Sequence, residues 1–134
     1  VSELAGQRDW IDDCYAADTV AEIVAALRGH DAGPANDAAN LIMSRSPIAL
    51  SVALESVRRA GKLDTLEDVL KQEYRVSCGS LRSHDLVEGI RAQLVDKDRN
   101  PQWSPRSLPE VSADDVEAYF APAEPDLSFE EHRR

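Results

Sequence analysis

The segment from Ser83 to Trp103, SHDLVEGIRAQLVDKDRNPQW, constrains the fold most because it contains both ends of one helix. Asp85 and Glu88 have the spacing of a capping box, which predicts a helix that begins near Leu86. A run of alternating charges followed by Pro101 ends the pattern, since proline cannot continue a helix. The segment therefore predicts one complete helix with a sharp stop.

This predicted helix has a single apolar face. Leu86, Ile90 and Leu94 recur at intervals of four residues, so their side chains share one side of the helix and are expected to be buried. Gly89 interrupts the pattern at a cost of about 1 kcal/mol relative to alanine. That cost is either simply tolerated or required by close approach of another backbone, and we favour the close approach.

The same combination of a capping residue and an apolar stripe recurs along the chain. It predicts further helices within Val1–Ala16, Val20–Leu27, Ala35–Arg45, Pro47–Ala60 and Leu66–Leu81, and a short one after Ser112. The helix over Pro47–Ala60 is apolar on more than one face, so we expect it to be the most buried. No stretch alternates with period two. The sequence therefore predicts an all-α fold with six or seven helices and no strand.

Two segments do not fit a helical pattern. Pro101, Pro105 and Pro109 follow one another too closely for regular structure, which predicts an extended strap along the surface with Trp103 packed beneath it. Residues 122–134 are expected to form a flexible tail. This divides the chain into a helical region, residues 1–121, and a tail, residues 122–134.

Charge and hydropathy exclude several function classes. The chain has 25 acidic and 15 basic residues and a net charge of −10, which opposes binding to nucleic acid or to an anionic membrane. No apolar run approaches 18 residues and the first residues are acidic, so we expect neither a membrane span nor a signal peptide. On these grounds the protein is expected to be cytoplasmic.

The residues that could carry chemistry do not form a recognisable set. His30 and His132 have no second ligand nearby, and His84 is expected to bind local backbone rather than transfer a proton. Cys14 and Cys78 are expected to be small buried residues rather than a disulfide or a metal pair. No nucleophile elbow and no glycine-rich phosphate loop occurs. We therefore predict no catalytic residue and no metal site in this chain.

A family resemblance is carried by four stretches of the sequence. The string EGIRAQLVDK, followed by Pro101 and Trp103, resembles the C-terminal signature of the crotonase (enoyl-CoA hydratase/isomerase) superfamily. The longer string HDLVEGIRAQLVDKDRNPQW is similar to the branch of 3-hydroxyisobutyryl-CoA hydrolases. Three other stretches agree in order: Ile11–Leu27, Ser46–Leu54 and Thr65–Ser77. The resemblance covers residues from about Asp9 to Phe120.

The resemblance implies that this chain is the helical C-terminal segment of a larger enzyme with an α/β spiral core. Such enzymes carry their oxyanion-hole amides and catalytic carboxylates in a larger upstream half. The implied reaction is hydrolysis of 3-hydroxyisobutyryl-CoA to 3-hydroxyisobutyrate and coenzyme A in valine breakdown. Coenzyme A is then part of the substrate, and no separate cofactor is implied.

In this interpretation the chain is a helical lid and packing segment, inactive alone. Its implied partners are the N-terminal core segment of the same protein, the acyl-CoA substrate and further copies in a homo-oligomer. Two alternatives stay open. One is an enoyl-CoA hydratase or isomerase, because the discriminating carboxylates lie upstream. The other, from a different class, is a self-standing helical interaction module.

Lys97 is the one binding residue that the resemblance implies. In relatives with this signature, a lysine just after the final helix lies near the phosphates of bound coenzyme A, and a compact ammonium on a flexible stem suits a phosphate. This sequence departs from the pattern because Asp98, rather than a second basic residue, follows. The spacing from Glu88 is also one residue longer. The simpler interpretation is a solvated lysine between Asp96 and Asp98.

Overall fold

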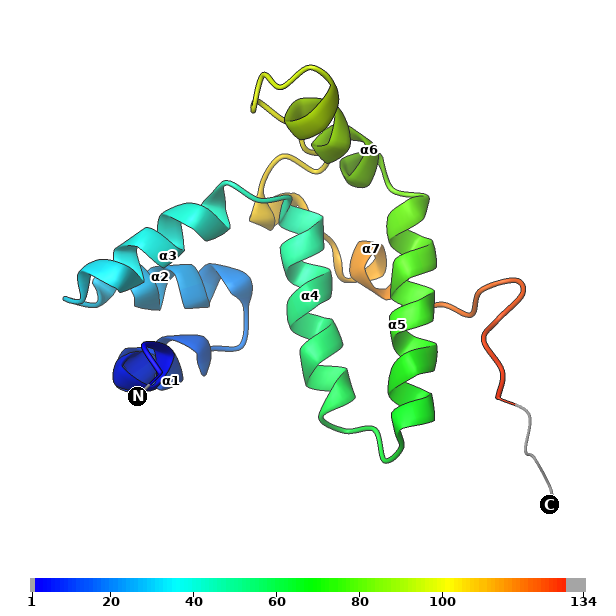
Figure 1. Cartoon of the computed structure of the whole chain (residues 1–134), viewed down its shortest axis with the longest axis horizontal. Coiled ribbons are helices and arrows are strands. Elements are labelled where there is room, and N and C mark those ends of the chain that lie inside the picture. The colour runs from blue at the N-terminus through cyan, green and yellow to red at the C-terminus, as the bar shows by residue number, and fades with distance from the viewer. Residues whose placement is uncertain (1, 130–134) are drawn as a thin grey trace.

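The computed structural model describes residues 2–129, in which the fold is all α and contains no strand (Figure 1). Its α-helices are α1 (Arg8–Tyr15), α2 (Val20–Gly29), α3 (Gly33–Met43), α4 (Pro47–Ala60), α5 (Leu66–Leu81), α6 (His84–Ile90) and α7 (Ala113–Glu117). Two 3₁₀ turns, η1 (Leu4–Gln7) and η3 (Leu108–Glu110), and a π-helical turn, η2 (Arg91–Val95), accompany them. The predicted all-α fold class is confirmed.

Hydroxyl side chains determine where most of these helices begin. At α2, Thr19 Oγ1 accepts a hydrogen bond from the Glu22 N–H (3.2 Å), and Glu22 Oε2 accepts one from the Thr19 N–H (2.9 Å). This capping box satisfies two N–H groups, one of the helix's first turn and one of the cap residue. The residues whose hydroxyls cap α4, α5, α6 and α7 are Ser46, Thr65, Ser83 and Ser112.

The predicted cap of α6 is wrong. Ser83 Oγ, and not Asp85, accepts the hydrogen bond from the Leu86 N–H (3.3 Å), so α6 begins at His84. The serine hydroxyl takes the cap position because the Asp85 carboxylate is turned into the protein, where its residue is only 6% exposed. Ser83 therefore caps α6, and Asp85 is a buried residue of its first turn.

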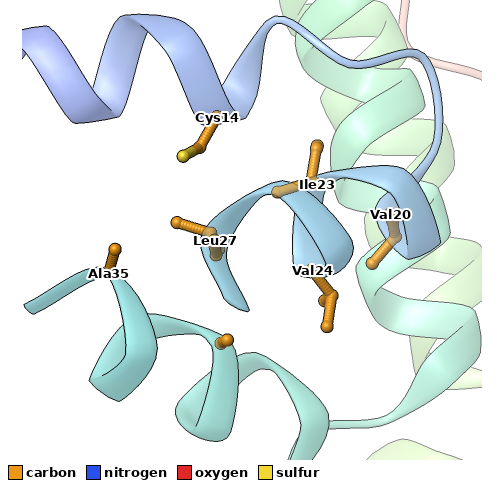
Figure 2. Close-up of a cluster of buried hydrophobic side chains, with 7 residues drawn as sticks. Cys14, Val20, Ile23, Val24, Leu27 and Ala35 are labelled. Atoms are coloured by element: carbon orange, nitrogen blue, oxygen red, sulfur yellow. The ribbon is translucent and has the colours of Figure 1, made fainter. Parts of the chain in front are cut away.

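The first hydrophobic core lies among α1, α2 and α3. Figure 2 shows Cys14 of α1 and Ala35 of α3 on either side of Leu27 of α2, which is fully buried. The other members of this core are Val20, Ile23, Val24 and Ala39. Cys14 therefore behaves as the small buried residue that the sequence analysis expected.

The second core lies along the antiparallel pair formed by α4 and α5, with α7 packed against α4 (Figure 1). Its buried residues are Ile48, Val52 and Phe120. Arg58 joins the two cores, because its guanidinium donates hydrogen bonds to the backbone carbonyls of Ala17 and Asp18 in the α1–α2 loop. The chain thus forms two helical clusters held side by side.

The prediction that the Pro47–Ala60 helix is the most buried is wrong. Only four of its residues are buried, and Val57 is 73% exposed. The helix does carry apolar residues on more than one face, but the described part of the chain covers only one of those faces. The described residues therefore leave part of the apolar surface of this helix exposed.

The strap and the described part of the tail both run against helices. Trp103 Nε1 donates to the Ser44 carbonyl (3.4 Å), which places the indole under the strap. In the tail, the Tyr74 hydroxyl donates to the Pro125 carbonyl (3.0 Å), and Arg75 Nε lies 3.1 Å from both carboxylate oxygens of Asp126. Residues 122–129 thus contact α5, whereas residues 130–134, with His132, lie outside the described range. The domain boundary at residue 121 stays a prediction.

Candidate functional site

An open groove of about 1020 Å³ lies between α4, α5 and α6. Figure 1 shows α6 crossing the end of the pair formed by α4 and α5, which leaves the inner faces of these helices turned toward one another. The lining is mostly apolar. Its apolar residues are Ile48, Ala49, Val52, Ala53, Val57, Ala60, Val76, Leu86, Ile90, Leu94, Pro101, Trp103 and Tyr119.

The apolar stripe predicted for the helix within Ser83–Trp103 forms one wall of this groove. Leu86, Ile90 and Leu94 are 38%, 45% and 68% exposed, so the chain does not bury them as predicted. A contiguous apolar surface of this extent is unusual on a protein that acts alone and marks an interaction site. The groove is therefore a candidate contact surface.

Gly89 lies on this wall, but its neighbour is not another backbone. A Cβ atom at Gly89 would lie 3.4 Å from the nearest atom of the Trp103 ring, which is an ordinary van der Waals distance. Among the described residues no second backbone approaches Gly89, so its predicted close contact with a backbone outside them stays a prediction. The glycine instead faces the indole that covers one end of the groove.

A buried polar cluster also lines the groove, close to Trp103. Ser46 and Asp85 are 7% and 6% exposed, and Ser46 Oγ donates to Asp85 Oδ2 across 2.5 Å. Asp85 Oδ1 accepts from the Ser104 N–H (2.8 Å) and lies 2.9 Å from His84 Nδ1. One carboxylate therefore joins the start of α4, the start of α6 and the strap. His84 contacts this carboxylate rather than local backbone, which corrects the sequence-based expectation.

Arg91 is the centre of a second polar cluster, at the junction of α6 with the loop that follows. Its guanidinium binds Glu88 in a bidentate manner (2.7 and 2.9 Å) and also contacts Asp96 Oδ2 and Asp98 Oδ2, both at 2.7 Å. It further donates to the Asn100 carbonyl (3.3 Å). One cation therefore holds three carboxylates and the backbone of the loop.

These contacts change the acidity of the carboxylates. Hydrogen bonds from Arg91, and then from the Gln102 N–H, lower the pKa of Glu88 from 4.5 to about 2. The same arginine, followed by the Asn100 N–H, lowers the pKa of Asp98. The pKa of Arg91 itself is raised by the three carboxylates it binds, Glu88 foremost. These shifts favour the ionised forms of Glu88, Asp98 and Arg91.

Lys97 lies in the loop held by Arg91, with its side chain exposed. The neighbouring Asp96 and Asp98 turn to Arg91, and within the described residues no carboxylate oxygen lies within 4 Å of the Lys97 ammonium. Arg99 likewise has no such partner there, and it lines the groove. Both Lys97 and Arg99 have left-handed backbones, with φ of 57° and 54°.

The described residues contain no group of three or more His, Cys, Asp or Glu side chains placed to hold a metal ion. None of their helices is both long and apolar enough to cross a membrane. His30 Nδ1 accepts a hydrogen bond from the Ala32 N–H (3.1 Å) and so has a local structural partner. What the described residues offer chemically is a contact surface and, in the loop after α6, the exposed cations Lys97 and Arg99.

Several contacts of these clusters were not identified from the sequence. The pair Glu88 and Arg91 has the i, i+3 spacing of a helical ion pair, so that contact was accessible to pattern analysis. The position of Arg99 on the groove wall was not accessible to pattern analysis, because it depends on the backbone of the loop. The bond between Ser46 and Asp85 joins residues 39 positions apart and leaves no local signal.

Comparison with known proteins shows close relatives of the whole chain. A family model described as enoyl-CoA hydratase/isomerase matches residues 1–120. The mitochondrial 3-hydroxyisobutyryl-CoA hydrolase of Homo sapiens is 38% identical over 117 residues, which cover 87% of this chain and 30% of that protein. The small ribosomal subunit protein mS47 of Arabidopsis thaliana is 42% identical over 129 residues, 91% of this chain and 31% of that protein.

Two solved structures share the fold. A carnitinyl-CoA dehydratase from Mycobacterium thermoresistibile superposes with a TM-score of 0.91 at 67% identity, over 98% of this chain and 38% of that one. An enoyl-CoA hydratase from Rhodobacter sphaeroides gives 0.86 at 35% identity, over 96% of this chain and 38% of that one. The chain thus spans only about a third of the length of the relatives it matches.

The comparisons contradict the predicted cytoplasmic localisation. The human hydrolase and a hydrolase-like relative from Arabidopsis thaliana, 42% identical over 132 residues, are both named as mitochondrial proteins. The expectation rested on the lack of a membrane span and of a signal peptide in these 134 residues. Such an absence in one segment carries no information about the compartment of a protein.

Proposed function

The chain belongs to the enoyl-CoA hydratase/isomerase family, and we propose that it is the helical C-terminal part of an enzyme that hydrolyses 3-hydroxyisobutyryl-CoA. The products would be 3-hydroxyisobutyrate and coenzyme A, a step of valine breakdown. The observation that carries this proposal is the match to the human hydrolase over 87% of the chain. Mouse and rat enzymes of the same name, each 37% identical over 112 residues, support it further.

In this enzyme the chain would not perform the chemistry. The upstream core would supply two backbone N–H groups for the oxyanion of the thioester and a carboxylate as base or nucleophile. The described residues would form a lid and packing segment, with the groove between α4, α5 and α6 as the surface that receives the core. The exposure of Leu86, Ile90 and Leu94 supports this role, because burial by the core would stabilise them.

Lys97 would contribute to substrate binding through a phosphate of coenzyme A. Its support is the absence of a carboxylate partner for the ammonium among the described residues, together with the exposed position of Lys97 in the loop after η2. The flanking aspartates, Asp96 and Asp98, bind Arg91 and not Lys97. The ammonium is therefore available to an external anion.

The second candidate function is the hydration or dehydration of an acyl-CoA. The structure that is 67% identical to this chain is named as a carnitinyl-CoA dehydratase. The residues that distinguish hydrolysis from hydration would lie in the upstream core, so this chain is compatible with both. The product decides between them, because hydrolysis releases a thiol and dehydration forms a conjugated double bond.

A third candidate, from a different class, is a helical module that acts only through binding. The relative named as a small ribosomal subunit protein supports it, since it matches 91% of this chain at 42% identity. Such a module should fold cooperatively by itself, whereas a lid segment should need its core.

The decisive experiment compares residues 1–134 alone with the same residues joined to the upstream core. We expect release of coenzyme A from 3-hydroxyisobutyryl-CoA, followed with a thiol reagent, only when the core is present. Formation of an enoyl-CoA without thiol release would assign the dehydratase alternative. A cooperative, monomeric melt of the isolated chain by circular dichroism, with no turnover in either form, would favour the interaction module. Turnover by the isolated chain would exclude the lid role.

A further inference from the structure

A second pocket, of about 480 Å³, lies beside the turn that joins α4 to α5. Figure 1 shows this turn at the end of the helix pair opposite α6. The charged residues that line this hairpin pocket are Arg59, Lys62, Asp68, Lys71 and Arg75. We propose that the hairpin pocket binds a small phosphate monoester that also carries a hydroxyl group. This site is separate from the loop after α6, and it does not depend on which reaction the enzyme performs.

Helix packing gathers positive charge in the hairpin pocket. Helix α4 supplies Arg59, the turn supplies Lys62, and α5 supplies Lys71 and Arg75. The chain as a whole has a net charge of −10, yet four of its 15 basic residues line this one pocket together with a single carboxylate. An acidic protein repels anions at long range, so it can bind one only where local cations outweigh that repulsion. The hairpin pocket meets this condition.

The carboxylates that bind the two arginines do not line the hairpin pocket. Arg59 binds Glu55 (2.6 Å) and Glu117, and these two glutamates line a separate pocket on the other side of Arg59. Arg75 binds Asp126 of the tail through Nε and Nη2, while its Nη1 has no acceptor in residues 2–129. The carboxylates thus hold both guanidinium groups in place from outside the pocket, and one nitrogen of Arg75 stays free for a ligand.

The two lysines of the hairpin pocket are available to a ligand. Lys62 has no carboxylate oxygen within 4 Å in the part of the chain that the structure describes. The Lys71 ammonium lies 4.0 Å from Asp68 Oδ1, while Asp68 Oδ2 accepts a hydrogen bond from the Thr65 hydroxyl (2.7 Å). Two ammonium groups and the free nitrogen of Arg75 provide three donor groups. This number matches the three terminal oxygens of a phosphate monoester, whereas a carboxylate has only two oxygens.

Gln72 indicates the hydroxyl group of the ligand. This residue lines the hairpin pocket and is only 8% exposed. Its Nε2 donates to the carbonyl (3.0 Å) and to the hydroxyl (3.2 Å) of Ser56, whereas its Oε1 accepts no hydrogen bond from any described residue. Buried amide oxygens normally accept a hydrogen bond. A phosphate dianion has no donor for this oxygen, but a hydroxyl group on the same ligand supplies one.

The test measures binding of glycerol 3-phosphate, inorganic phosphate and 3-hydroxyisobutyrate to the intact enzyme by titration calorimetry at low salt. Coenzyme A is present at saturation, so that its own binding site is occupied. We expect glycerol 3-phosphate to bind more tightly than inorganic phosphate, because it adds hydroxyl groups to the same anion. We also expect it to bind more tightly than 3-hydroxyisobutyrate, whose anion is a carboxylate. Glycerol, which lacks the anion, should not bind measurably.

Substitutions of the lining should change this affinity in opposite directions. Lys62→Gln and Lys71→Gln should each raise the Kd for glycerol 3-phosphate about threefold to tenfold, and less at high salt. Asp68→Asn should lower it, because this change removes the one carboxylate of the lining. A residue that only stabilised α5 would not strengthen binding when it is replaced. Arg82→Gln is the matched control, since Arg82 is exposed at the end of α5 outside the lining, and it should leave the Kd unchanged.

Gln72→Met tests the hydroxyl contact. It should raise the Kd for glycerol 3-phosphate to that for inorganic phosphate and leave the latter unchanged. Lys62→Gln, at an exposed residue, keeps the site testable if Gln72→Met does not fold.

Three results would overturn the proposal. The first is the absence of phosphate binding, or binding that neither lysine variant weakens. The second is binding that saturating coenzyme A abolishes, since the phosphate would then occupy the substrate site. The third is tighter binding of 3-hydroxyisobutyrate than of glycerol 3-phosphate, which would assign the pocket to a carboxylate.

Discussion

At the scale of single residues, the two glycines of α5 and α6 differ in what they touch. A Cβ atom at Gly79 would lie 3.0–3.2 Å from Tyr119, including 3.1 Å from its backbone Cα, whereas at Gly89 the nearest atom belongs to the Trp103 ring at 3.4 Å. Within the described residues, close approach of another backbone therefore occurs at Gly79 and not at Gly89. The sequence could not distinguish them, because both look like a glycine within a helical pattern.

This difference predicts opposite effects of alanine at the two positions. Gly79→Ala should lower the melting temperature of the intact enzyme, since displacing the backbone of Tyr119 costs about 1–3 kcal/mol and exceeds the gain in helix propensity. Gly89→Ala should be neutral or stabilising by up to about 1 kcal/mol. Thermal melts of both variants check this. Equal destabilisation would contradict the role of Tyr119.

Glu88 supplies a prediction about pH. Its pKa is lowered from 4.5 to about 2 in the folded protein, so its ionised form is favoured by folding. The stability it contributes is fully present above pH 4.5 and is lost as the pH falls toward 2. Glu88→Gln should therefore reduce the slope of melting temperature against pH within this window and leave the slope above pH 6 unchanged. An identical slope in both proteins would show that the ion pair with Arg91 does not affect stability.

At the scale of elements, the start of α4 carries two functions in one hydroxyl. Ser46 Oγ accepts a hydrogen bond from the Ala49 N–H (3.2 Å) as the helix cap and donates one to the buried Asp85. The cap was predictable, because serine before proline is a local signal. The bond to Asp85 was not, since it depends on how α6 packs beside α4.

A comparison with α5 separates these two functions. Thr65 caps α5 in the same way, with no buried partner, so Thr65→Ala should cost about 1 kcal/mol. Ser46→Ala should cost about 1–3 kcal/mol more, because it also leaves a buried carboxylate without one of its donors. Denaturant unfolding of the two variants measures the difference. Equal costs would mean that the bond to Asp85 adds nothing beyond the cap.

At the scale of the whole molecule, the apolar groove decides whether the chain acts alone. Leu94 and Val87 are 68% and 65% exposed, but Leu94 lines the groove and Val87 does not. Leu94→Asp should therefore weaken association with the upstream core, because it would bury a charge in that contact. Val87→Asp should have little effect.

Co-purification of a tagged core with separately expressed residues 1–134 measures this association, with Val87→Asp in α6 as the control for a charge introduced beside the π turn that carries Leu94. Equal retention of both variants would exclude the groove as the docking surface. Equal loss of both would indicate a general effect on α6 rather than a contact with the core.

The helices of this protein were determined by local sequence, since a cap acts over three residues and an apolar stripe over a few turns. That is why the positions of α2, α4 and α5 and the absence of strands in residues 2–129 followed from the pattern. Tertiary structure alone decided the pairing of Ser46 with Asp85 and the assignment of both aspartates to Arg91. These contacts select among several nearby partners, and the choice depends on where packed helices and a left-handed loop place each charge.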